Sequence, residues 1–167
     1  MKKIVIVSDT HIPFRAKKLP QKLLDACQEA DFIIHAGDWQ TLDVYHELAA
    51  YAEIDGVTGN VDPWEILEKF GRKKILTFGE LKIGIVHGDS DRKPTEQQAY
   101  DTFADEGVDI IVFGHSHTPV MREVDGVTLF NPGSPTDKRR QAQFSFGLLE
   151  IGDSWELKHV FFDKESS

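Results

Sequence analysis

Short apolar segments alternate with segments of helical spacing over most of the chain. The first apolar segment, residues 4–7 (IVIV), is continuous and β-branched, which is typical of a short strand buried on both faces. Residues 20–28 begin with a proline and then place apolar side chains at helical spacing. We expect further buried strands at 32–34, 54–57, 83–86 and 110–113, and further helices at 42–51, 64–70 and 95–106. This alternation predicts an α/β fold.

The last third of the chain has the pattern of β-hairpins. Residues 120–124 and 127–130 flank Asp125–Gly126, a pair that is typical of a tight turn. The same pattern joins 144–151 to 155–162, and 75–78 to 81–86. We therefore predict a two-layer β-sandwich flanked by helices, in a single domain from residue 1 to 163. Residues 164–167 are polar and are expected to form a frayed tail.

Directly after each of five expected buried strands, the sequence has side chains that can bind metals. Glycine stands next to several of them, which lets the backbone turn sharply and approach a bound group. If the five strands are parallel neighbours, their loops meet at one sheet edge, where ligands collect in α/β sheets. The side chains are Asp9, His11, Asp38, Asn60, His87, His115 and His117.

Each of these motifs also has a common explanation that involves no metal. Gly37–Asp38 is typical of a turn, Asn60 tolerates a left-handed conformation, and a single histidine such as His87 is more often a hydrogen-bonded core residue. His115 and His117 are stronger candidates, because alternate residues of an extended segment face the same way. The recurrence at five equivalent positions favours a shared partner, since polar groups left unpaired at a sheet edge cost desolvation energy.

Composition and charge limit the classes of function. The chain has 167 residues, of which 40% are hydrophobic, and its formal net charge is -9. This length suits one domain, and the acidic balance disfavours nucleic acid as a partner. The basic run at residues 138–140 (KRR) is too short to indicate nucleic acid binding. Cys27 is the only cysteine, and the first apolar run is too short for a signal peptide or membrane span, so we expect a cytoplasmic protein.

The ordered motif set resembles that of the calcineurin-like metallophosphoesterases. It consists of Asp9-x-His11, Gly37–Asp38, Gly59–Asn60, His87 and Gly114–His115-x-His117. The short length and the loop at 131–134 (NPGS) resemble the small bacterial and archaeal phosphodiesterase branch of YfcE-like proteins, whose fold the retromer scaffold subunit shares.

The resemblance implies a pair of divalent metal ions. One metal would be held by Asp9, His11 and His117, the other by Asn60, His87 and His115, and Asp38 would bridge both. Oxygen and imidazole ligands without a thiolate point to Mn, Fe, Zn or Ni and do not choose among them. Mn is the metal that we expect, with Fe, Zn or Ni as alternatives.

The same resemblance implies hydrolysis of a small phosphodiester. Two metals about 3.5–4 Å apart can hold a bridging hydroxide that attacks the phosphoryl group. Asn60 and His87 are the expected catalytic residues, and Asn60 and Ser134 the expected substrate contacts. Homo-oligomer formation is left open.

Two positions depart from the pattern of many relatives. Val61, followed by Asp62, stands where a leaving-group histidine is common, so general-acid help is missing or comes from another group. Asp89 stands where relatives often carry another histidine; it is a candidate for orienting a ligand imidazole or for capping a turn. Two alternatives are kept. One is a phosphomonoesterase or protein phosphatase, against which the missing histidine at position 61 argues, and the other is a metal-free scaffold of the same fold.

A few further residues near the motifs are candidates for supporting the site or contacting the substrate. His35 is expected to be a core histidine or a support for a ligand, and Trp39 is a candidate for the pocket wall. Arg15 and residues 17–18 (KK) are candidates for phosphate contacts, but we interpret them as surface charges.

Overall fold

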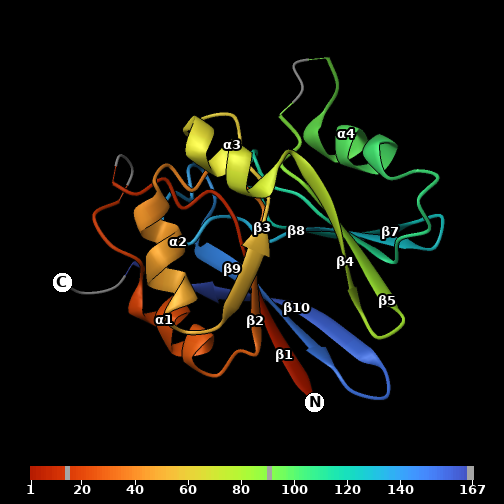
Figure 1. Cartoon of the computed structure of the whole chain (residues 1–167), viewed down its shortest axis with the longest axis horizontal. Coiled ribbons are helices and arrows are strands. Elements are labelled where there is room, and N and C mark those ends of the chain that lie inside the picture. Colours follow the sequence, from red (N-terminus) through yellow and green to blue (C-terminus); the bar gives the residue numbers. More distant parts are fainter. Residues whose placement is uncertain (14–15, 90–91, 165–167) are drawn as a thin grey trace.

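The first of two sheets is built around the N-terminal strand. The computed structural model describes residues 1–13, 16–89 and 92–164. Its first sheet has the strand order β10-β9-β1-β2-β3, with β1, β2 and β3 parallel and β9 antiparallel to both of its neighbours, β1 and β10 (Figure 1). The strands are β1 (Lys2–Val7), β2 (Phe32–His35), β3 (Glu53–Gly56), β9 (Phe144–Ile151) and β10 (Trp155–Phe162).

The second sheet has the order β4-β5-β6-β8-β7. Its strands β5, β6 and β8 are parallel, while β4 and β7 pair antiparallel at the two edges as hairpin partners. The strands are β4 (Lys73–Phe78), β5 (Leu81–Val86), β6 (Ile110–Val112), β7 (Val120–Val124) and β8 (Val127–Asn131).

Helices cover the outer faces of both sheets. Helices α1 (Gln21–Gln28), α2 (Leu42–Ala49) and α3 (Trp64–Phe70) pack on the first sheet, and α4 (Thr95–Thr102) packs on the second (Figure 1). Helix α4 ends four residues before the expected boundary, because Phe103 leaves the helix and packs on Gly84 of β5.

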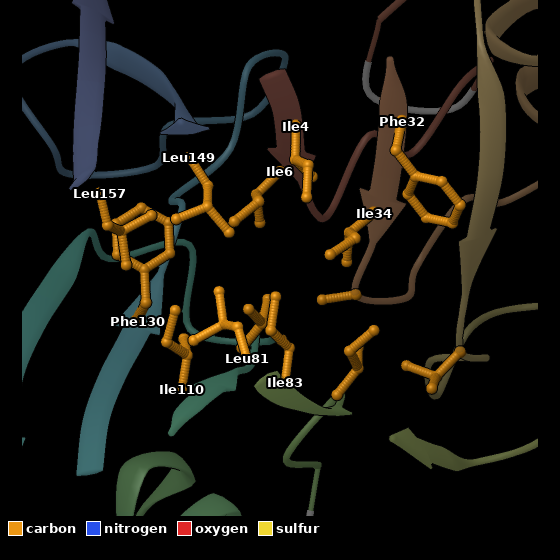
Figure 2. Packing of buried hydrophobic residues seen from close by; sticks show 14 residues of the cluster. Ile4, Ile6, Phe32, Ile34, Leu81, Ile83, Ile110, Phe130, Leu149 and Leu157 are labelled. Carbon is orange, nitrogen blue, oxygen red and sulfur yellow. The ribbon is translucent and has the colours of Figure 1, made fainter. Parts of the chain in front are cut away.

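Successive side chains of a strand point to opposite faces of its sheet, and this alternation produces three layers of apolar packing. In β1, Ile4 and Ile6 point between the two sheets, and Val5 and Val7 point toward the helices on the outer face. Figure 2 shows Ile4 and Ile6 opposite Ile83 and Ile110 of the second sheet. A continuous apolar strand therefore serves both faces of the first sheet, as expected for a strand buried on both sides.

The predicted sandwich flanked by helices is confirmed, including its three hairpins. One assumption was wrong. The five loops with metal-binding side chains do not follow neighbouring strands of one sheet: three follow β1, β2 and β3, and two follow β5 and β6 of the other sheet. The expected tail at 164–167 falls, apart from Lys164, outside the described residues. Over the described ranges, no helix has the length and apolar character that a membrane crossing requires.

Candidate metal centre

Loops from both sheets converge beyond the ends of their parallel strands. The loop after β1 bonds to the loop after β2 through the Asp9 N–H and the Gly37 carbonyl at 2.9 Å. The loop after β6 reaches the first sheet through the His115 N–H, which donates to Asp9 Oδ2 at 3.1 Å. Within the described chain, two groups of side chains could each hold a metal ion: Asp9, His11 and His117; and Asp38, His87 and His115.

Three imidazole nitrogens surround one carboxylate oxygen at the centre of the site. Asp9 Oδ1 lies 3.7 Å from Nε2 of His11, 3.7 Å from Nε2 of His87 and 3.6 Å from Nε2 of His117. Asp38 Oδ2 lies 3.0 Å from Nε2 of His87 and 3.6 Å from Nε2 of His11. All five side chains are buried. Asp38 therefore lies between the two groups, where a bridging ligand has to be.

The central polar atoms lack hydrogen-bond partners. Among the described residues, the buried side-chain atoms with no such partner are Asp9 Oδ1 and Nε2 of His11, His87 and His117. Buried polar groups are nearly always satisfied, so four unsatisfied atoms that face one another indicate a missing common partner. A divalent cation fits, because every one of these atoms can offer a lone pair to it.

Backbone carbonyls fix the tautomer of two imidazoles. His87 Nδ1 donates to the Ala36 carbonyl at 2.8 Å, and His117 Nδ1 donates to the Asp137 carbonyl. A carbonyl can only accept, so Nδ1 carries a proton, and Nε2, the nitrogen that would bind a metal, points into the site. This is the arrangement of metal-binding histidines in proteins, where a hydrogen bond to the other ring nitrogen sets the orientation.

Side-chain amides play the same part for the other two histidines. His11 Nδ1 lies 3.3 Å from Gln40 Oε1, and His115 Nδ1 lies 3.2 Å from Asn60 Oδ1. Asn60 is exposed and His115 half-buried, so both can meet a ligand from solvent.

The charges of the site shift the pKa values of its members. Burial would raise the pKa of Asp9, but His87, His11 and His117 around it hold that pKa well below its usual range. Burial would lower the pKa of His87, but the carboxylates of Asp9 and Asp38 raise it to about 9. Asp9 is thus ionised at neutral pH, as a metal-binding carboxylate must be.

Two glycines allow the loops to approach closely. A Cβ atom on Gly59 would overlap with Oδ1 of Asp38, and one on Gly114 would overlap with Oγ of Ser8 and lie 2.8 Å from Asp9 Oδ2. These glycines are needed because carboxylates pack directly against the backbone at both positions.

A cavity of about 410 Å³ opens beside the candidate metal ligands. It is lined by His11, Asp38, Gln40, Asn60, Val61, His115 and Arg139. A depression of similar volume, about 430 Å³, lies between the β4–β5 and β9–β10 turns. Those turns lie with the N-terminus at the lower end of the molecule in Figure 1, so that depression is remote from the ligands, which follow the other ends of β1 and β5.

The sequence matches a known family over most of its length. A model described as the calcineurin-like phosphoesterase superfamily domain matches residues 1–154. The chain belongs to the calcineurin-like phosphoesterase superfamily.

Curated relatives and solved structures agree with this membership. A probable metallophosphoesterase of Methanocaldococcus jannaschii is 35% identical over 94% of this chain and 80% of its own length. A phosphodiesterase of the same organism is 29% identical over 78% of this chain and 82% of its own length. The structure of Vps29 from Entamoeba histolytica in complex with Zn²⁺ has a TM-score of 0.77 at 25% identity, over 96% of this chain and 99% of that chain.

Asp62 holds two of the loops at the candidate metal centre together. Its Oδ2 accepts hydrogen bonds from the backbone N–H of Asp38 and of Gly59, both at 2.8 Å, and its Oδ1 accepts one from the N–H of Gln40 at 2.7 Å. Burial raises the pKa of Asp62, and the three N–H donors oppose that rise. Sequence reasoning considered Asp62 only as part of a departure from the family pattern and missed this clamp.

Ser134 lies inside the wall of the site. It is buried, and its hydroxyl donates to the Asp9 carbonyl at 2.8 Å and accepts the N–H of Asp137 at 2.9 Å. The hydroxyl therefore braces the loop after β1. It is not among the residues that line the cavity.

His35 and Trp39 support the site from behind. His35 is fully buried, and its Nδ1 accepts the Gly37 N–H at 3.1 Å while its Nε2 lies 3.1 Å from Thr10 Oγ1. Trp39 stacks on the His35 ring at 3.9 Å and is also fully buried, so it belongs to the core and not to the pocket wall.

Asp89, Lys17 and Lys18, the other described candidates from the sequence, form no hydrogen bond or ion pair with the candidate metal ligands. The other ring nitrogen of His87 is already held by the Ala36 carbonyl, which leaves no place for Asp89 as its orienting partner. Lys17 and Lys18 are exposed, and Arg15 lies outside the described residues.

Proposed function

We propose that this chain is a dinuclear-metal phosphoesterase that hydrolyses small phosphodiesters. The observation that carries the proposal is the group of four buried atoms without hydrogen-bond partners, Asp9 Oδ1 and three imidazole nitrogens, beside the carboxylate of Asp38. Family membership and a relative described as a phosphodiesterase support the type of reaction.

The ligands divide between two ions. Asp9, His11 and His117 would hold one, Asn60, His87 and His115 the other, and Asp38 would bridge them. When bound, the two ions would supply the Lewis acidity that activates water and stabilises charge on a phosphoryl group. Mn²⁺ is our first choice for both sites, with Fe, Zn or Ni as alternatives; the similar Vps29 structure holds Zn²⁺.

The side chains of the cavity have separate tasks in this proposal. Asn60 is exposed beside His115, so its amide is placed to contact a phosphoryl oxygen as well as a metal. His87 is buried and fixed by the Ala36 carbonyl, so its role is to hold a metal and not to move. For Ser134 we propose the bracing of the loop after β1 in place of a substrate contact, because its hydroxyl is already engaged.

No histidine follows Asn60, and Val61 occupies that part of the cavity wall. Without a leaving-group acid at this place, turnover should favour esters with good leaving groups, such as aryl or nucleotide esters. A cytoplasmic location and assembly into a homo-oligomer are further proposals.

Metal content and turnover test the proposal together. Purified protein is stripped with a chelator, reloaded with Mn²⁺ and assayed with an aryl phosphodiester and an aryl phosphomonoester. We expect two metal ions per chain and faster cleavage of the diester. Faster cleavage of the monoester would favour the phosphomonoesterase alternative, and a chain that takes up no metal would favour the scaffold.

A matched pair of variants tests the bridging role. Asp38→Asn should abolish turnover and the binding of two ions while the fold is kept. Asp153→Asn makes the same change at an exposed position in the β9–β10 turn and should behave like the wild type. Retained turnover in Asp38→Asn would contradict the bridging role.

A further inference from the structure

Left-handed backbone conformations cluster at the metal centre. Eight residues other than glycine have a positive φ in the described chain, and each such conformation costs free energy. Asp125 is one of them, in the tight turn between β7 and β8, where such a conformation is expected. The other seven are Asp9, His11, Asp38, Gln40, His115, His117 and Arg139.

Six of these seven residues have a clear reason to be there. Five are proposed metal ligands, and Gln40 holds His11 through a hydrogen bond of 3.3 Å. Arg139, with a φ of 51°, is the member of the cluster that neither role explains. Strained conformations persist where the surrounding structure fixes them, and they gather at functional sites.

The loop that carries Arg139 is tied to the metal centre. Between β8 and β9, Ser134 donates to the Asp9 carbonyl, and Thr136 Oγ1 donates to the Thr10 carbonyl at 2.6 Å. The Asp137 carbonyl, two residues before Arg139, accepts the hydrogen bond from His117 Nδ1. The backbone of Arg139 is therefore held in a fixed position relative to the ligands.

Arg139 is an exposed residue of the cavity wall, and its guanidinium group has no partner within the described chain. Arg139 lines the cavity together with Asn60 and His115, and it is the only lysine or arginine among the described residues that do so. Over the ranges that the structure describes, its side chain has no hydrogen bond and no ion pair. Its charge reaches the metal centre: burial lowers the pKa of His117, and Arg139 is one of the groups that add to that effect.

A free guanidinium at this place has a definite chemical use. Its planar fork of N–H donors matches two oxygens of a phosphate group, which gives strong charge-assisted hydrogen bonds. A surface arginine that serves only solubility needs neither a strained backbone nor a place in the cavity wall.

We infer that Arg139 is a substrate-binding residue, which hydrogen-bonds the phosphoryl oxygens of the ester from the part of the cavity wall that the loop between β8 and β9 forms. The inference rests on the proposed function, because it assumes a phosphoester in this cavity. Arg139 would add a cationic contact that the metal ions alone do not provide, and it would fix the orientation of the phosphoryl group.

Inorganic phosphate serves as the probe, because it carries the recognised group without a leaving group. The Mn²⁺-loaded protein is titrated with phosphate by calorimetry, as wild type and as Arg139→Gln, Arg139→Lys and Arg140→Gln. Arg140 is exposed and does not line the cavity, so its variant makes the same charge change outside the site. Bound metal is measured for every variant.

We expect Arg139→Gln to weaken phosphate binding by about 10- to 100-fold, the range for a lost hydrogen bond to a charged group, with unchanged metal content. Arg139→Lys should restore part of the affinity, and Arg140→Gln should stay within about twofold of the wild type. Unchanged binding by Arg139→Gln, equal losses in both glutamine variants, or no phosphate binding by the wild type would each overturn the inference. If the wild type binds phosphate but hydrolyses no ester, the proposed function fails while the binding data still decide the role of Arg139.

Discussion

Oδ2 of Asp62 accepts a 2.8 Å hydrogen bond from the backbone N–H of Asp38 and so clamps the loop after β2 to the loop after β3. The same oxygen accepts the Gly59 N–H, and the other oxygen accepts the N–H of Gln40. Three N–H donors occupy the carboxylate, which therefore positions a candidate metal ligand and is not free to give a proton to a leaving group.

Asp62→Asn separates the clamp from a role as general acid. The variant replaces one acceptor oxygen with an amide donor, so we expect metal affinity to fall by about 10-fold, at the lower end for residues that orient metal ligands. At saturating Mn²⁺, turnover should fall by the same factor for aryl diesters with good and with poor leaving groups. A loss that grows steeply with the pKa of the leaving group would instead identify Asp62 as the acid.

Gly59→Ala should damage the metal centre through a steric overlap. A Cβ atom at this position would overlap with Oδ1 of Asp38, whose loop is held by Asp62 and cannot give way easily. We expect a loss of about 1–3 kcal/mol in the free energy of unfolding, typical of overpacking, and clearly weaker metal binding.

Gly152→Ala is the matched control for that variant. Around Gly152 the nearest atoms to an added Cβ lie 3.9 Å and 4.0 Å away, so the methyl group fits. Denaturant unfolding and metal titration of both variants check the prediction. Equal behaviour of the two variants would show that the loops have more room than the structure indicates.

The imidazole of His35 should be neutral and carry its proton on Nε2. Its Nδ1 accepts the Gly37 N–H, so Nε2 must donate to Thr10 Oγ1, and the Thr10 hydroxyl in turn donates to the Trp39 carbonyl at 3.3 Å. The candidate ligand His87 differs, because its Nδ1 donates to the Ala36 carbonyl and therefore carries a proton. Nitrogen-15 NMR of the imidazole rings distinguishes the two tautomers, and an Nδ1 proton on His35 would contradict the network.

The same histidine should contribute to acid sensitivity. Burial lowers the pKa of His35 to about 3, whereas an unfolded chain takes up this proton near pH 6.5. Its contribution to stability is therefore fully present above about pH 6.5 and is lost as the pH falls toward 3. In the folded protein the His35 ring signals should not titrate between pH 8 and 5; protonation within that range would contradict the prediction.

Cys27 should be inert in the folded protein. It is fully buried in α1, and burial raises the pKa of its thiol to about 12, so the reactive thiolate is scarce at pH 8. A chromogenic disulfide reagent should react with the native protein only at the rate at which the chain unfolds, and with one equivalent at once in denaturant. Fast stoichiometric reaction of the native protein would show that α1 opens locally.

The local elements followed from the sequence because each depends on nearby residues. The run 4–7 became the buried strand β1, and the turn residues at Asp125–Gly126 and Gly79–Glu80 marked two hairpins correctly. The end of α4 was missed by four residues because Phe103 turns away to pack on Gly84, a contact between distant parts of the chain.

The sequence also determined which loops carry metal-binding side chains, since their types and order are a property of the chain itself. Only the tertiary structure decided that these loops come from two sheets, that Asp62 clamps two of them and that Arg139 lines the cavity. Nothing in the local pattern distinguishes Arg139 from Arg140, or Asp62 from an ordinary turn residue. The difference lies in where the packed sheets and loops place each side chain, and that depends on contacts between residues far apart in the chain.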